Sequence, residues 1–150
     1  MSDYSCILLA IDLTDEAQEV TKRALAIQKN NDAELHLIHV IEPLSFAYGG
    51  DIPMDFSSIQ DEIQKQAENQ LNDFAEKHNI ESAHKHLRVG KAETEIHELA
   101  DEINADLIVI GSHGRHGLAL LLGSTANGVL HGATCDVLAV RIARHETVDG

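Results

Sequence analysis

Glycines and hydroxyl residues in the last third of the chain have the spacing of an anion-binding loop. Gly111, Gly114 and Gly117 follow a short apolar run, and the triplet Gly123-Ser124-Thr125 comes shortly after them. Glycine lets the backbone approach a ligand closely. A helix that begins at Ser124 presents free N–H groups, which favour anions such as phosphate. The segment therefore indicates a loop between a buried strand and a helix that could bind a phosphate group.

The elements that must position this loop alternate between apolar runs and amphipathic stretches. Apolar runs predict strands that are buried on both faces, at residues 5–11, 34–41, 107–110 and 136–142. A more polar run at residues 83–89 is typical of an edge strand. Helical periodicity predicts helices near residues 17–29, 56–79, 94–103 and 124–131. This alternation predicts one α/β domain with a parallel sheet.

Three candidate binding residues lie at the ends of predicted strands. In open α/β sheets, ligands bind beyond the carboxyl ends of the strands, where the strand order reverses. Asp12, Val40 and Gly111 all lie at or just after such ends, so we expect them to face one crevice. The long loop at residues 44–55 is expected to border it. A turn or capping role without a ligand remains open for Asp12 and for Ser124-Thr125.

The charge of the chain excludes several classes of partner. The formal net charge is −14, so the chain lacks the basic field that attracts nucleic acids or an anionic membrane. No apolar run approaches the roughly 20 residues of a membrane span, and the first residues show no basic signal region.

Cys6 and Cys135 make neither a disulfide framework nor a CxxC metal pair. We therefore expect both to be small buried thiols of a cytoplasmic protein.

Four segments in this order resemble the universal stress protein family. They are Ile7-Leu8-Leu9-Ala10-Ile11-Asp12, Leu37-Ile38-His39-Val40, Gly111-Ser112-His113-Gly114-Arg115-His116-Gly117 with Gly123-Ser124, and Cys135-Asp136-Val137-Leu138-Ala139-Val140. The resemblance makes residues 1–142 the family's domain and residues 143–150 a polar C-terminal tail. It implies an open five-stranded parallel sheet of order 3-2-1-4-5, with helices on both faces. It also implies a homodimer through the last strand, Val137 to Ile142, whose exposed edge is otherwise a liability.

The resemblance implies that ATP, or ADP or AMP, binds in the crevice with an accompanying Mg²⁺ ion. The family's ATP-binding pattern resembles Gly-x2-Gly-x9-Gly-Ser/Thr, but eight residues separate Gly114 from Gly123 here. Either the loop absorbs the missing residue and nucleotide binding is retained, which we favour, or the loop closes too tightly for a triphosphate. The implied nucleotide-binding residues are Ala10, Ile11, Asp12, Val40, Gly111, Ser112, His113, Gly114, Arg115, Gly123, Ser124 and Thr125.

Metal binding and catalysis receive less support from the sequence. His84 and His86 lie two apart on a predicted strand and share a face, but no third ligand is evident, so we expect a solvated edge and no protein metal site. The sequence has no Gly-x-Ser-x-Gly elbow and no Walker A loop. Fast ATP hydrolysis is not predicted, although slow activity is compatible with the chain.

The hypothesis from the sequence is a cytoplasmic, dimeric stress protein that binds an adenine nucleotide and acts as a switch read by an unknown protein partner. The alternative is an interaction module without nucleotide, like the family's non-binding branch. A third hypothesis is an enzyme for a phosphate-containing substrate, with Asp12 or His113 as its base.

Overall fold

The computed structural model describes residues 3–12, 17–42, 56–112 and 124–141 of the 150-residue chain. The predictions for the long loop 44–55, for most of the glycine-rich segment and for the tail 143–150 fall outside the described residues.

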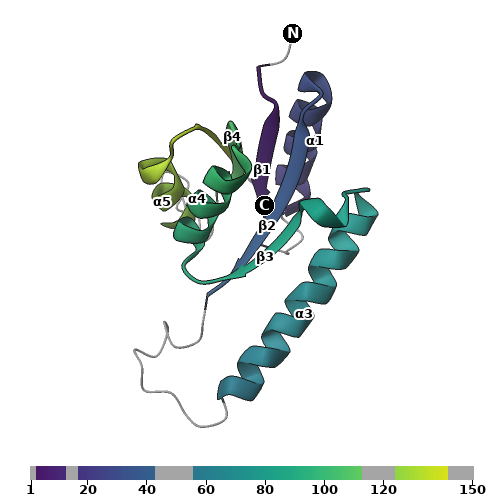
Figure 1. The fold of residues 1–150 in the computed structure, drawn as a ribbon, viewed down its shortest axis with the longest axis vertical. Helices are drawn as coiled ribbons and strands as arrows, with labels where there is room; N and C mark the ends of the chain where they lie inside the picture. Colours follow the sequence, from purple (N-terminus) through teal and green to yellow (C-terminus); the bar gives the residue numbers. More distant parts are fainter. Residues whose placement is uncertain (1–2, 13–16, 43–55, 113–123, 142–150) are drawn as a thin grey trace, which may run out of the picture.

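Five parallel strands form one sheet in the order β3-β2-β1-β4-β5 (Figure 1), which confirms the predicted fold class. The first strand has the continuous burial expected of a central strand, because Ile7, Leu8 and Leu9 are each 0% exposed. The strands are β1 (Cys6–Ala10), β2 (Glu34–Ile41), β3 (Lys85–Val89), β4 (Leu107–Ser112) and β5 (Asp136–Arg141).

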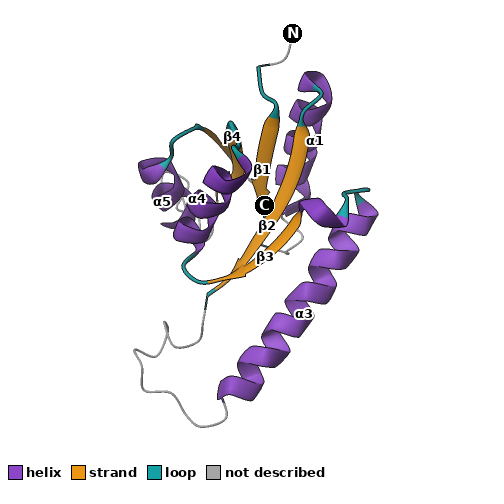
Figure 2. Ribbon diagram, viewed as in Figure 1, coloured by secondary structure: helices purple, strands orange, loops and turns teal. Residues whose placement is uncertain are grey.

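Helices cover both faces of the sheet (Figure 2). The helices α1 (Ala17–Asn31) and α3 (Phe56–Lys77) pack on one face, and α4 (Ala92–Ile103) and α5 (Ser124–Gly132) pack on the other. Alternate side chains of each strand therefore enter two separate apolar cores. On β1, for example, Leu9 belongs to the core under α1, and Leu8 belongs to the core under α4.

Two strands have an end that differs by two residues from the sequence prediction. Strand β4 continues through Gly111 and Ser112, because these residues still pair with β5. Strand β3 begins only at Lys85, since a short 3-10 turn, η1 (Ser82–His84), occupies the residues before it. Cys6 is buried as expected, whereas Cys135, directly before β5, is only half-buried, and both cysteines are free thiols.

Asp106 fixes the start of β1 beside the start of β4. Its carboxylate accepts hydrogen bonds from the N–H and hydroxyl of Ser5 and from the N–H of Cys6, at 2.9 to 3.2 Å. Burial alone would raise the pKa of Asp106, but these hydrogen bonds outweigh it and lower the pKa. The carboxylate is therefore charged at neutral pH and sets the register of the central strands.

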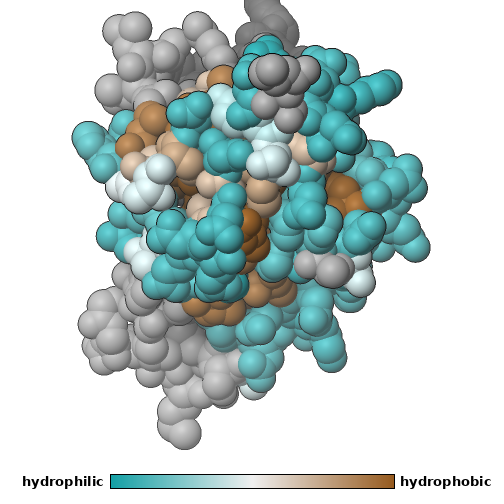
Figure 3. Space-filling model, turned by 45° about the horizontal axis from the view of Figure 1, so that its top comes forward, coloured by the Kyte–Doolittle hydropathy of each residue, from teal (hydrophilic) through white to brown (hydrophobic). Residues whose placement is uncertain are grey.

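The face in Figure 3 is mainly hydrophilic, with apolar side chains visible between the hydrophilic ones. Large apolar side chains that are exposed lie on separate elements: Ile59 and Ile63 on α3, Val89 on β3 and Leu130 on α5. No helix in the described part of the chain has both the length and the apolar composition that crossing a membrane requires.

Candidate functional site

The strand order places a reversal point between β1 and β4. The chain passes from β1 to β2 and β3 on one side and then crosses to β4 on the other. Open α/β sheets bind ligands at such a point, beyond the carboxyl ends of the strands. Ala10 is the register partner of both Ile38 on β2 and Ile110 on β4. Strand β1 ends at Ala10, whereas β2 continues to Ile41 beside β3 and β4 continues to Ser112 beside β5. The carboxyl ends of β2 and β4 therefore flank the residues that follow β1.

The structure places the candidate residues from the strand ends around this reversal point, at the carboxyl ends of the strands. Ala10 is half-buried, Ile11 is buried and Asp12 is exposed. Val40 lies two residues beyond Ile38 on β2 and is half-buried. Gly111 pairs with β5 as the fifth residue of β4, and the backbone of Ser112 follows it. Ser124 and Thr125 are the first residues of α5, and the remaining candidates lie outside the described residues: His113, Gly114, Arg115 and Gly123.

His39 holds the segment that follows β1. Its Nδ1 lies 2.9 Å from the carbonyl oxygen of Ile11, and the N–H of Ile11 donates to the carbonyl of Ile38 at 3.0 Å. A carbonyl oxygen only accepts, so Nδ1 carries the proton and donates it. The side chain thereby positions the residue just before Asp12. Sequence reasoning missed this role, for which the available signal was a polar residue inside an otherwise apolar strand.

The N-terminus of α4 also lies at this edge, but a side chain already occupies it. The N–H of Ala92 donates to the carboxylate of Glu42 at 3.2 Å, and the N–H of Gly90 donates to the carbonyl of Ile41 at 2.9 Å. A negative group is favourable at a helix N-terminus. The other helix on this face, α5, begins at Ser124, so its N-terminus is the candidate for a ligand's phosphate.

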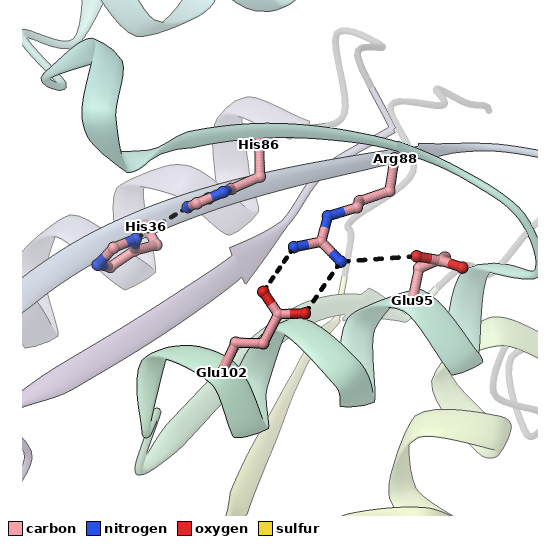
Figure 4. A network of polar contacts seen from close by, with 5 residues as sticks. All are labelled: His36, His86, Arg88, Glu95 and Glu102. Atoms are coloured by element: carbon pink, nitrogen blue, oxygen red, sulfur yellow. Dashed lines mark hydrogen bonds and ion pairs between the residues drawn. The ribbon is translucent and has the colours of Figure 1, made fainter.

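A polar network joins the edge strand β3 to α4 (Figure 4). Arg88 on β3 donates to Glu102 at 2.9 Å and lies 3.8 Å from Glu95, both on α4. The hydrogen bond from Arg88 lowers the pKa of Glu102. Arg88 therefore anchors the edge strand β3 to α4.

His86 on β3 and His84 in the preceding turn η1 contact a third histidine, His36 on β2, instead of forming the solvated edge that we expected. Figure 4 shows His36 and His86. Nδ1 of His36 lies 3.0 Å from Nε2 of His86, and the ring of His84 stacks on the ring of His36 with centroids 4.1 Å apart. Burial, followed by the neighbouring histidines, lowers the pKa of both His36 and His86. Burial, together with Glu34 and Asp106, raises the pKa of the nearby Cys6 thiol to about 11. The buried groups of this cluster are thus uncharged at neutral pH, and the cluster lies at the amino ends of β1 and β2, away from the reversal point.

The strand order, the two helical layers and the reversal point define an open, doubly wound α/β protein. The sequence model of the universal stress protein family matches residues 3–141. The chain belongs to the universal stress protein family, as its motifs indicated.

A curated relative agrees with this family assignment, and solved structures agree with the fold. Universal stress protein A homolog 2 of Coxiella burnetii is 44% identical over 146 residues, which cover 95% of this chain and 98% of that protein. The structure of universal stress protein UspA from Lactobacillus plantarum matches with a TM-score of 0.75 at 23% identity, over 95% of this chain and 100% of that one. A universal stress protein solved in complex with cAMP matches with a TM-score of 0.62 at 25% identity, over 95% and 100% of the two chains.

Proposed function

We propose that this universal stress protein binds an adenine nucleotide, as ATP, ADP or AMP, at the carboxyl ends of β1, β2 and β4. One observation carries the proposal. Ala10 pairs with both Ile38 and Ile110, so the segments that begin at Ile11 and Gly111 flank the reversal point of the sheet. The relative that was solved with cAMP supports an adenine nucleotide as the class of ligand.

Each part of the nucleotide has candidate partners in this arrangement. Asp12 would contact the adenine or ribose, and Val40 would line the adenine pocket. Gly111 and Gly114 would let the backbone approach the ribose and phosphates. The start of α5, Gly123-Ser124-Thr125, would donate to phosphate oxygens, and Arg115 would add positive charge. A Mg²⁺ ion would bind mainly to phosphate oxygens and water, and would neutralise part of the phosphate charge.

We propose that a protein partner recognises the nucleotide-bound state of this protein. Nucleotide contact at Asp12 would reach β2 through the bond between His39 and the carbonyl of Ile11. The two free cysteines fit the reducing cytoplasm, where we place this function.

The first experiment identifies what the protein carries. The chain is purified without added nucleotide and denatured, and the released small molecules are identified by mass spectrometry. Near-stoichiometric ATP, ADP or AMP would support the proposal. A protein that releases none, and whose melting temperature ATP with Mg²⁺ does not raise, would contradict it, because a ligand that binds only the native state must stabilise that state.

The second candidate function is an interaction module that binds no nucleotide. The observation that favours it is the number of residues between Gly114 and Gly123. Eight residues separate them here, one fewer than the nine of the ATP-binding pattern that the sequence resembles. In this case the same thermal experiment shows no shift with ATP, ADP or AMP, while the fold stays intact.

Replacing His39 by leucine is expected to weaken nucleotide binding about fivefold to tenfold, because the segment before Asp12 loses its hydrogen bond. Isothermal titration calorimetry with ATP measures the affinity. Asn31→Leu is the control, since the amide of Asn31 also donates to a backbone carbonyl, that of Ile27 at 2.8 Å, but beside the amino end of β1. Equal affinities for the two variants would show that His39 does not position the site.

We also propose a homodimer that pairs strand β5 of two copies across a two-fold axis. Among the described strands, β5 pairs only with β4, so its outer edge offers backbone groups to a second strand. Sedimentation equilibrium is expected to give twice the chain mass of 16.4 kDa. A mass that stays at one chain over a wide range of protein concentration would remove this proposal.

A further inference from the structure

Side chains that prefer transition metals gather at the amino ends of β1 and β2. Cys6 and Glu34 are direct register partners on these neighbouring strands, and His36 lies two residues after Glu34 on the same face. Cys6 and His36 are each only 7% exposed, whereas the side chain of Glu34 is 65% exposed. The cluster therefore combines two buried side chains with one glutamate that is exposed to solvent.

The ligand atoms of Cys6, Glu34 and His36 are close enough to share one ion. They all lie within 4.8 Å of one another, and Oε1 of Glu34 is 3.5 Å from Nε2 of His36. Bonds of about 2.0–2.3 Å from a tetrahedral zinc ion place its ligand atoms about 3.3–3.7 Å apart. The carboxylate and imidazole already have this spacing, and the sulfur of Cys6, which lies within 4.8 Å of both ligand atoms, must come closer to them on binding.

The surroundings of His36 hold its ring in the orientation that a ligand needs. Nδ1 faces Nε2 of His86 at 3.0 Å, and His84 stacks on the ring. With its proton on Nδ1, His36 donates to His86 and keeps the lone pair of Nε2 free on the side of Glu34. Metal-binding histidines characteristically donate their second ring N–H to an acceptor, usually a carboxylate, a carbonyl or water, which fixes the tautomer. Here Nε2 of His86 would be that acceptor.

We propose that Cys6, Glu34 and His36 form a binding site for a zinc-class divalent ion, with water as the fourth ligand. Thiolate, imidazole and carboxylate together suit Zn²⁺ and Co²⁺ and do not suit Mg²⁺ or Ca²⁺, which prefer oxygen ligands. On binding, the sulfur–metal bond replaces the S–H bond of Cys6, and the proton passes to solvent. The site lies at the amino ends of the strands, opposite the carboxyl ends where the reversal point lies. The metal proposal does not depend on nucleotide binding.

Cobalt alone is the probe that tests the ligand set. Chelator-treated protein is titrated with Co²⁺ and followed by absorption. The expected result is one tight ion per chain, with a near-ultraviolet sulfur-to-cobalt charge-transfer band that added Zn²⁺ removes. Cys6→Ser should lose this band, and Cys135→Ser, the matched change at the other free thiol, should keep it. Binding without the band, or a band that depends on Cys135, would overturn the proposal.

Glu34 provides a test that does not disturb the core, since its side chain is exposed. Glu34→Gln is expected to fold like the parent and to bind Co²⁺ about tenfold more weakly or worse. Glu81→Gln, an exposed glutamate in the turn before β3, is the matched control and should bind like the parent. An unchanged affinity in Glu34→Gln would also overturn the proposal, because a simple ion pair between Glu34 and His36 requires no metal.

Discussion

Gly114→Val is expected to abolish adenine-nucleotide binding while leaving the fold intact. A β-branched side chain at this position would occupy the space in which the proposed ligand approaches the backbone. At an ATP concentration of about 100 times Kd, the parent should gain about 2.7 kcal/mol, which raises the melting temperature by about 5–10 °C. The variant should show no rise.

Thermal unfolding with and without ATP and Mg²⁺ measures this effect, and circular dichroism checks the fold. Gly117→Val is the matched control, because Gly117 belongs to the same glycine-rich segment but not to the spacing pattern of Gly114 and Gly123. If Gly114→Val binds ATP like the parent, the proposed site is misplaced. If both valine variants lose binding, general disturbance of the segment explains the loss better than a direct contact at Gly114.

Leu9→Ala is expected to cost about 2–5 kcal/mol of the free energy of unfolding. Leu9 is 0% exposed at the centre of β1 and packs in the core under α1. The substitution removes buried apolar surface and leaves a cavity that the surrounding strands can only partly close. Denaturant unfolding at one fixed protein concentration measures the loss, since the proposed dimer would make stability depend on concentration.

Leu130→Ala on α5 is the matched control for this core substitution. Leu130 is 41% exposed, and alanine is the better helix former. Its cost should stay below about 1 kcal/mol. Similar losses in the two variants would mean that β1 does not occupy the centre of the core.

The fold was predictable because burial leaves a local pattern. The run from Cys6 to Ile11 has no alternation of polar residues, and a strand covered by helices on both faces requires this. The order of the strands came from the family resemblance, since periodicity does not state which strands are neighbours. Boundaries were less predictable: glycine suggested that the strand ends before Gly111, but pairing with β5 extends it through Ser112.

The candidate nucleotide site was partly predictable for the same reason. Asp12, Val40 and Gly111 follow or end apolar runs, and the carboxyl ends of parallel strands share one edge. The positioning role of His39 was not identified, because its partner is the backbone carbonyl of Ile11, the residue that follows the neighbouring strand β1. Nothing in the local sequence of β2 states which carbonyl lies beside it.

The sequence by itself determined the class of fold, the family and the chain segments of the proposed nucleotide site, since each depends on short-range pattern and spacing. Only the tertiary structure decided that Cys6, Glu34 and His36 share one place and that His86, 50 residues after His36, supports its ring. The physical reason is register. Crossover connections join these parallel strands, and a shift of one residue in pairing would turn every side chain to the opposite face.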